Sequence, residues 1–131
     1  MKGRNFMKLD PDCIRDILLE IENTCSYHKI FSYPCNSEFL DKYDEDVVMY
    51  HVRQCHLSGL LHKTSFYLGG GCSVMDLTPE GHKFLADIRS DTNWNRTKDI
   101  AKSVGSMSLN AITDISAKVI AQLISKQMGL S

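Results

Sequence analysis

The 131-residue sequence lacks any long apolar run, and its longest hydrophobic stretches are only a few residues. A helix that spans a bilayer needs roughly 20 such residues. The segment from Met1 to Met7 is basic but lacks the apolar stretch of a secretory signal. We therefore expect a cytoplasmic protein with no membrane partner.

Short catalytic signatures are also missing. No GxSxG, HExxH, P-loop or GxGxxG pattern occurs in the chain. The three glycines Gly69–Gly71 lie between two predicted strands and open no helix, so they indicate a tight turn and not a phosphate cradle. The sequence predicts a protein that is not an enzyme, with no catalytic residue and no cofactor.

Cysteine occurs five times, but the odd number, the irregular spacing and the missing export signal argue against a disulfide framework. The close CxxC pairs of structural zinc sites are absent. Two looser groupings remain as metal candidates, namely Cys25 with His28 and Cys35, and His51 with Cys55. We favour free thiols packed as small apolar side chains, and predict no bound metal.

The charge has no strong excess of either sign, with 15 basic and 16 acidic residues. Residues 1–43 carry six Lys/Arg and seven Asp/Glu, residues 44–90 carry four and six, and residues 91–131 carry five and three. Phosphate neutralisation supplies much of the affinity of a protein for DNA. The slightly acidic middle segment therefore argues against a strong DNA binder.

Apolar residues at helical spacing are frequent in the chain. Apolar residues recur at helical spacing over residues 14–21, after an N-cap and a proline at Asp10-Pro11. A second long helix is predicted from Asp44-Glu45-Asp46 to Ser58-Gly59, and a third follows Thr78-Pro79-Glu80. The sequence therefore predicts three helices before residue 91.

Strand-forming composition fills the gaps between these helices. Residues 29–33 predict a short edge strand, and residues 37–40 a single helical turn. Residues 60–68 and 72–77 flank the three glycines and predict a β-hairpin. Helix, strand, helix, hairpin and helix, in this order, match the winged helix.

The remainder of the chain, residues 91–131, predicts a helical tail packed on this domain or on a second copy. One helix is expected at 91–104 and another after Ser108. The apolar stripe of the last helix is Leu109, Ile112, Ile115, Val119, Ile120, Leu123 and Ile124. The predicted fold class is thus α+β and mostly helical, a winged-helix domain over residues 1–90 with two additional C-terminal helices. The stripe is long enough to predict a homodimer through the last helix.

Two segments resemble parts of bacterial winged-helix regulators. Residues 48–61 resemble their recognition helix and following strand, and residues 77–85 resemble the passage from the wing into the next helix. The chain also resembles a family of small bacterial, phage and prophage proteins whose domain has no known function. The matching segments are Met7-Lys8-Leu9-Asp10, residues 14–22, Tyr50-His51-Val52, Leu77-Thr78, Gly81-His82, Phe84-Leu85, Ile88-Arg89, Asp91-Thr92, Trp94-Asn95, Thr97-Lys98 and Gly105-Ser106. The resemblance implies a winged-helix fold and a phage or prophage origin, and it supplies no activity.

The side of the second long helix opposite Val48, Val52 and Cys55 is the predicted interaction surface. Arg53 and Gln54 suit guanine and adenine edges. The full set of candidate nucleic-acid contacts is Met49, Tyr50, Arg53 and Gln54 on this helix, His62 and Lys63 on the hairpin, and Arg96 and Lys98 beside Trp94. The alternative is a solvated polar face, with Trp94 covering the core and His51 tying its helix to a nearby carbonyl.

Two hypotheses follow from these residues. The first is a prophage-type protein that binds double-stranded DNA in a regulatory or accessory role, such as transcription regulation. The second is a module that uses the same fold to recognise a host or phage protein. The acidic start of the second long helix, Asp44-Glu45-Asp46, favours the second hypothesis, because a DNA reader usually carries neutral or basic groups there.

Overall fold

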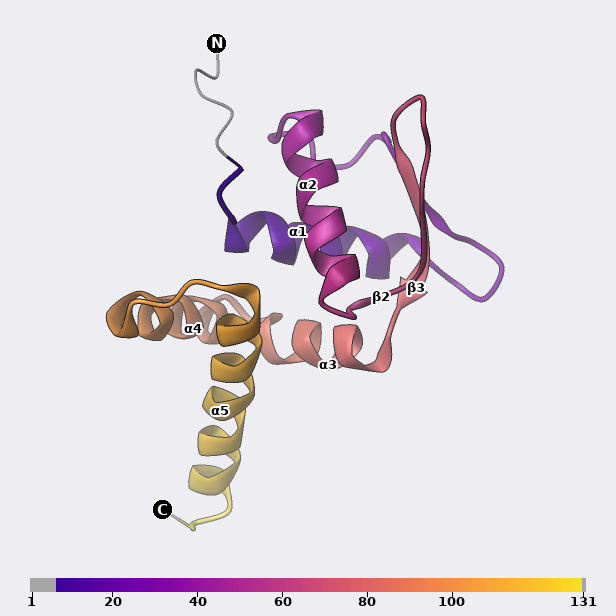
Figure 1. Cartoon of the computed structure of the whole chain (residues 1–131). Coiled ribbons are helices and arrows are strands. Elements are labelled where there is room, and N and C mark those ends of the chain that lie inside the picture. Colours follow the sequence, from indigo (N-terminus) through magenta and orange to yellow (C-terminus); the bar gives the residue numbers. More distant parts are fainter. Residues whose placement is uncertain (1–6, 131) are drawn as a thin grey trace.

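The computed structural model describes residues 7–130 of the chain (Figure 1). Over this part the fold is α+β and mostly helical, with five helices and one three-stranded sheet. In chain order the elements are α1 Pro11–Thr24, β1 Phe31–Tyr33, α2 Glu45–Leu57, β2 Leu61–Phe66, β3 Cys72–Leu77, α3 Pro79–Ile88, α4 Asp91–Val104 and α5 Leu109–Gln127. Every predicted long helix and strand is present, and the predicted fold class is confirmed as α+β.

Helices α1, α3, α4 and α5 begin at residues whose side chains cap them. Asp10 accepts a hydrogen bond from the backbone N–H of Asp12, while Thr78, Ser90 and Ser108 each accept one from the residue three positions on. These bonds satisfy N–H groups that have no partner within the helix. The capping residues predicted for α1, α3 and α5 are therefore confirmed.

Helix α1 forms the centre of the core. Its buried apolar residues are Cys13, Ile14, Ile17, Leu18 and Ile21, and they pack against α2, α3 and the sheet. Val48, Val52 and Cys55 of α2 are completely buried, so the predicted inward face of that helix is confirmed.

The sheet has β3 at its centre, in the order β1-β3-β2. Strands β2 and β3 form the predicted hairpin, which we call the ribbon, with Leu61 opposite Leu77 and Phe66 opposite Cys72. Strand β1 pairs antiparallel with the other edge of β3. Gly71 has φ +87°, and a side chain there would lie 2.6 Å from the carbonyl oxygen of Tyr33. Only glycine fits where β1 approaches the ribbon turn.

The segment between β1 and α2 contains turns and no helix longer than one turn. The backbone N–H of Asp41 donates to the carbonyl oxygen of Ser37 at 3.0 Å, a bond that closes one helical turn, so the single turn predicted at residues 37–40 is confirmed. Polar bonds to α1 hold this segment in place. Ser37 donates a hydrogen bond to Glu20, and the hydroxyl of Tyr43 donates one to Asp16 at 2.6 Å. Leu40, buried between them, adds an apolar anchor.

Arg15 joins α1 to the start of the helical tail. Its guanidinium donates to the carbonyl oxygens of Ile88 and Arg89 at the end of α3, and pairs with Asp91 at 3.1 Å. Trp94 is buried and its indole N–H donates to Asp12 at 2.8 Å. The prediction that Trp94 covers the core is confirmed.

Helix α5 packs on the molecule with its first half only. Leu109, Ile112, Ser116 and Val119 are buried, whereas Leu123 and Ile124 are exposed. Figure 1 shows the second half extending past α3 and α4. The predicted apolar stripe is thus covered over about half of its length.

Among residues 7–130, no helix is both long enough and apolar enough to cross a bilayer.

Candidate interaction surface

The outward side of α2 and the neighbouring end of the ribbon form one continuous surface, which we call the α2–ribbon surface (Figure 1). Helix α2 contributes Met49, Tyr50 and Arg53, and the ribbon contributes Phe66. The ribbon turn lies against the start of α2, since a side chain on Gly70 would lie 3.7 Å from the Glu45 carboxylate. Helical spacing in α2 and the orientation of Phe66 place these side chains together, whereas alternation along the strand turns Tyr67 to the opposite face of the ribbon, where its hydroxyl bonds to Ser73.

A groove of about 510 Å³ runs across this surface. Its lining residues are Met7, Asp46, Met49, Tyr50, Arg53 and Phe66. The Arg53 guanidinium lies 5.6 Å from the centre of the Tyr50 ring, and the His56 ring meets the edge of Phe66 at 5.9 Å. The groove therefore has aromatic and thioether walls with one cation and one carboxylate.

The structure brings some of the predicted contact residues together and separates the rest. Met49, Tyr50 and Arg53 line the groove. Gln54 follows Arg53 in α2 and is half-buried, and it does not line the groove. His62 and Lys63 are exposed on β2. Lys63 has a positive φ of 55°, which is costly for a residue with a side chain.

The two predicted contacts on α4 do not line the groove. Arg96 is exposed. Lys98 pairs with Asp12 at 2.8 Å and lies 5.3 Å from the centre of the Trp94 ring. Lys98 is therefore not a free surface cation, because the contact of α4 with α1 brings it to the carboxylate of Asp12.

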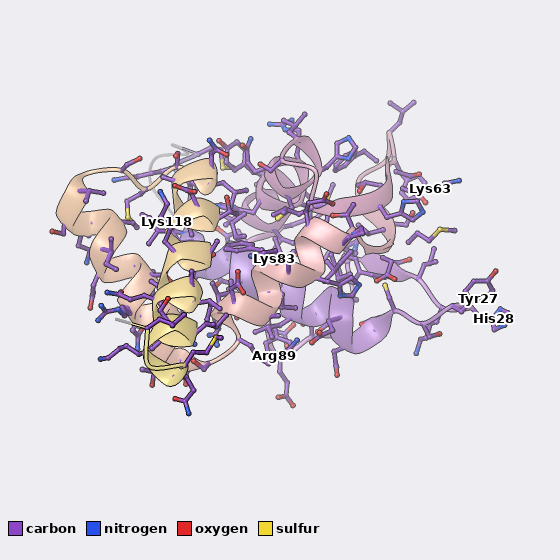
Figure 2. The ribbon with its side chains drawn as sticks, turned by 90° about the horizontal axis from the view of Figure 1, so that it is seen from below. Tyr27, His28, Lys63, Lys83, Arg89 and Lys118 are labelled. Carbon is purple, nitrogen blue, oxygen red and sulfur yellow. The ribbon has the colours of Figure 1, made fainter. Side chains whose placement is uncertain are left out.

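Basic residues are dispersed over the molecule instead of forming a stripe. Figure 2 shows Lys63 on the ribbon well apart from Lys118 on α5, with Lys83 on α3 and Arg89 at the end of α3 between them. Many basic groups pair with acids: Lys83 with Asp87, Arg89 with Glu22, and Lys118 with Asp114. The start of α2 is acidic, with Glu45 and Asp46 both exposed. This distribution is unlike the basic footprint of a nucleic-acid binder.

His51 has a structural role. It is buried, its Nδ1–H donates to the carbonyl oxygen of Val47 at 2.7 Å, and its Nε2 accepts from the backbone N–H of Asp10 at 2.7 Å. The predicted bond to a carbonyl is confirmed, and a second bond joins α2 to the cap of α1. Both ring nitrogens are therefore occupied by backbone groups.

The cysteines divide by burial. Cys13, Cys55 and Cys72 are buried, Cys25 is half-buried with its thiol near the carbonyl of Val74, and Cys35 is exposed. Burial raises the pKa of Cys13 and Cys55, and raises the pKa of Cys72 to about 11. These thiols stay protonated near neutral pH. In the part of the chain that the structure describes, no three His, Cys, Asp or Glu side chains are grouped to hold a metal.

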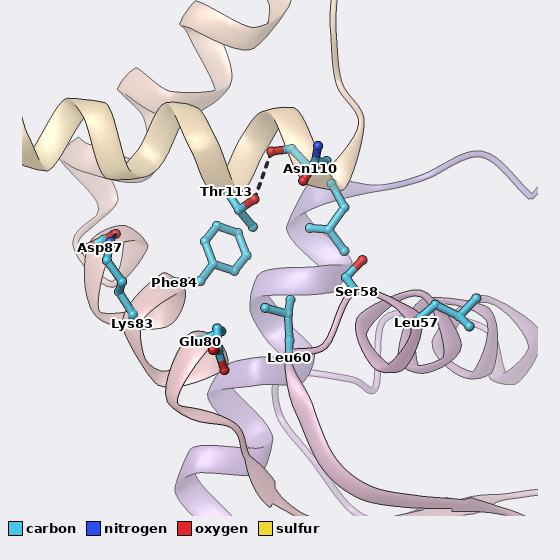
Figure 3. Close-up of a pocket in the computed structure, with 10 residues that line it drawn as sticks. Leu57, Ser58, Leu60, Glu80, Lys83, Phe84, Asp87, Asn110 and Thr113 are labelled. Atoms are coloured by element: carbon cyan, nitrogen blue, oxygen red, sulfur yellow. Dashed lines mark hydrogen bonds and ion pairs between the residues drawn. The ribbon is translucent and has the colours of Figure 1, made fainter.

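A second cavity, which the sequence analysis missed, lies between the end of α2, the start of α3 and the start of α5 (Figure 3). It has a volume of about 490 Å³. Leu57, Leu60, Phe84 and Leu109 supply apolar walls, while Glu80, the Lys83–Asp87 pair, Asn110 and Thr113 supply the polar edge. Its residues come from separate helices, so no single motif in the sequence reveals it.

The fold and the α2–ribbon surface define a small α+β protein that presents a helix beside a two-stranded ribbon. By sequence the chain belongs to the family described as "Hypothetical protein (DUF2513)", whose model matches residues 8–108. It is also similar to a protein of Haemophilus influenzae described as "Uncharacterized protein", with 30% identity over 121 residues that cover 90% of this chain and 99% of the relative. No solved structure matches significantly. The inferred resemblance to a family of unknown function is confirmed.

Proposed function

We propose that this chain is a winged-helix protein of phage or prophage type that acts in the cytoplasm as a non-enzymatic module for protein recognition. The partner binds to the α2–ribbon surface. The proposal rests on the fold order, on the side chains of this surface and on the distribution of charge.

The winged-helix assignment is supported by element order and pairing. Helix α1, strand β1, helix α2, the ribbon and helix α3 follow one another, and β1 adds to the outer edge of β3. In this fold α2 is the recognition helix and the ribbon is the wing. The turns at residues 34–44 stand where many such domains have an additional helix, and Ser37 and Tyr43 fasten them to α1.

The observation that carries the function is the exposed aromatic composition of the α2–ribbon surface. Phe66 is about half exposed and lies beside Met49 and Tyr50 in the groove, and Tyr67 and Leu68 are exposed near the turn of the ribbon. Aromatic and methionine side chains are enriched in protein interfaces, and clustered exposed apolar groups mark such sites. A surface that contacts only water is expected to carry polar side chains at these positions instead.

The charge of the surface specifies the chemistry of the partner. Glu45 and Asp46 are exposed beside the groove, and Arg53 lies over Tyr50 within it. A protein segment with an apolar side chain for the groove and a cation facing the start of α2 complements this arrangement. Duplex DNA would instead bring phosphates toward two carboxylates.

The test is affinity capture from host cells, followed by calorimetric titration of each captured protein in purified form. Phe66→Ser and Tyr50→Ala are expected to weaken binding roughly tenfold or more, as interface anchors do. Met75→Ser, which changes an exposed apolar residue of β3 outside the groove, is the matched control. Equal affinities for Phe66→Ser and the control would place the binding site elsewhere.

DNA binding is the second candidate, favoured by Arg53 and Gln54 on α2 and by the exposed His62 and Lys63 on β2. Fluorescence anisotropy with random duplex DNA at low and moderate salt decides between the two. A protein-recognition module gives at most weak binding, on the order of 10⁻⁴ M at physiological salt. Micromolar binding that falls with salt, and falls further in the Arg53→Ala/Lys63→Ala double variant, would instead establish DNA as the ligand.

A further inference from the structure

One face of α5, which we call the α5 face, is polar at its start and apolar toward the C-cap Met128, and it runs from the α2–α3–α5 cavity to the free half of the helix. Its residues, spaced by three or four positions as one helical face requires, are Asn110, Thr113, Ala117, Ile120, Ile124 and Met128. Asn110 and Thr113 line the cavity between α2, α3 and α5. Ile124 and Met128 lie on the free half of the helix, 52% and 65% exposed.

We infer that two copies of this chain pair through α5 in antiparallel orientation, so that the C-terminal turns of each helix occupy the α2–α3–α5 cavity of the other. Each copy supplies both the cavity and its occupant. The interface is therefore self-complementary, as twofold symmetry requires.

The helix dimensions fit this arrangement. Met128 lies eight residues beyond Ile120, about 12 Å at 1.5 Å per residue. Thr113 and Asn110 lie seven and ten residues before Ile120, roughly 10 to 15 Å. A twofold axis near Ile120 therefore brings Met128 of one copy to the cavity of the other. Because the free half of α5 extends past the rest of the molecule (Figure 1), the partner has room to approach.

The charges are complementary as well. Residues 115–130 contain two cations, Lys118 and Lys126, and no Asp or Glu. At the cavity edge Lys83 pairs with Asp87 at 2.9 Å, which leaves the Glu80 carboxylate as the net charge (Figure 3). Lys126 of the incoming helix thus meets an acidic edge. Antiparallel pairing also sets opposite helix dipoles side by side.

Light scattering coupled to size-exclusion chromatography tests the inference over a range of protein concentrations. The wild-type chain is expected to be a dimer at tens of micromolar. Ile124→Glu on the free helix and Leu57→Glu at the cavity should each weaken association roughly tenfold or more. Both positions are exposed, so the monomer is expected to keep its fold, which circular dichroism verifies.

Val104→Glu is the matched control, because Val104 is a 66% exposed apolar residue at the end of α4, outside both the α5 face and the cavity. It should leave association unchanged. A wild-type chain that stays monomeric at several hundred micromolar overturns the inference. A dimer that Ile124→Glu and Leu57→Glu weaken no more than Val104→Glu overturns it too.

Crosslinking tests the orientation. In a Cys35→Ser background, a mixture of Asn110→Cys and Met128→Cys chains should form a disulfide under mild oxidation, whereas each variant alone should form little. Rapid crosslinking of Met128→Cys chains with themselves would show parallel pairing and overturn the inference.

Charge reversal tests the contact between Lys126 and Glu80. Glu80→Lys and Lys126→Glu should each weaken the dimer several-fold, and the double variant should restore it. These readouts do not depend on any ligand of the α2–ribbon surface, so they are independent of the proposed function.

Discussion

At the residue scale, His51 shows how one buried polar side chain links two helices. It donates to the carbonyl of Val47 on its own helix and accepts from the N–H of Asp10 at the start of α1. A buried polar group that loses its partner costs free energy, which makes both bonds important. The sequence suggested a carbonyl partner for His51, but Asp10, 41 residues away, became visible only in the folded chain.

His51→Phe keeps most of the volume and removes both hydrogen bonds. The N–H of Asp10 then lies without an acceptor, so the free energy of unfolding should fall by about 1–3 kcal/mol. Urea denaturation followed by circular dichroism measures this difference. His56→Phe, at an exposed position whose ring only touches the edge of Phe66, is the control and should change stability by less than about 0.5 kcal/mol. Similar losses in both variants would contradict a specific role for His51.

The five thiols are expected to differ sharply in reactivity. Cys35 is exposed, although partial burial and the charges of Glu20 and Asp41 raise its pKa. Burial raises the pKa of Cys13, Cys55 and Cys72, so at pH 8 these groups are both protonated and inaccessible. In the native protein, Ellman's reagent should modify Cys35 first and reach the three buried thiols only on unfolding.

Two comparisons check this assignment. Cys35→Ser should abolish the fast phase of the reaction. Because the pKa of Cys35 is raised, its reaction rate should continue to increase as the pH rises above the ordinary pKa of a thiol. Fast labelling of a second cysteine in Cys35→Ser would show that one of the other four is accessible.

At the element scale, α4 docks on α1 through a small polar cluster. Asp12 accepts from the indole N–H of Trp94 and from Lys98, both at 2.8 Å. Partial burial alone would raise the pKa of Asp12, but these hydrogen bonds and the nearby charges outweigh it and lower the pKa. The folded state therefore favours the ionised carboxylate.

The pH dependence of this contact follows from that direction. A carboxyl whose pKa is lowered by folding stabilises the native state above its unfolded pKa, near 3.8, and loses this contribution as the pH falls through its folded value. Asp12→Asn should thus be less stable than wild type at pH 6, and the difference should shrink below about pH 4. Denaturant titrations followed by the fluorescence of Trp94, the only tryptophan, measure it.

Asp114→Asn is the matched control for Asp12→Asn. Asp114 forms an exposed pair with Lys118 within a single helix, and such pairs contribute little to stability. It should therefore show almost no difference from wild type at either pH. A pH-independent loss of stability in Asp12→Asn would show that the neutral amide fails for a reason other than charge.

Elements also differ in how well the sequence predicts them. The caps at Asp10, Thr78 and Ser108 and the turn at Gly69–Gly71 depend on neighbours within a few residues, so they are readable from the sequence. The single helical turn at residues 37–40 was predictable from local composition, but its place in the fold was not, because Asp16 and Glu20 of α1 hold this segment. The pairing of β1 with β3 likewise depends on where the ribbon lies.

At the scale of the whole molecule, two surfaces lie open on different elements. The α2–ribbon surface presents aromatic side chains for the proposed partner protein, and the α5 face is the proposed contact with a second copy. A dimer through α5 would carry two α2–ribbon surfaces, which increases the effective affinity for a partner with repeated sites.

Dimerisation should make thermal stability depend on concentration. Because association stabilises the folded chain by mass action, a 100-fold increase in protein concentration should raise the Tm by about 4 °C. Differential scanning calorimetry of wild type and Ile124→Glu at matched concentrations measures this shift. The variant should have a lower Tm than wild type at each concentration, because its dimer is weaker, and a constant Tm in wild type would contradict dimerisation.

The sequence by itself determined the helices, the ribbon, their order and the buried face of α2, because spacings of two to four residues decide which side chains share a face. It also indicated Met49, Tyr50 and Arg53 as one surface. Only the tertiary structure decided that Lys98 pairs with Asp12, 86 residues away, and that half of the α5 stripe stays exposed. Only the tertiary structure brings α2, α3 and α5 together around the cavity. Such features depend on how elements pack against one another, and no short spacing in the chain encodes that.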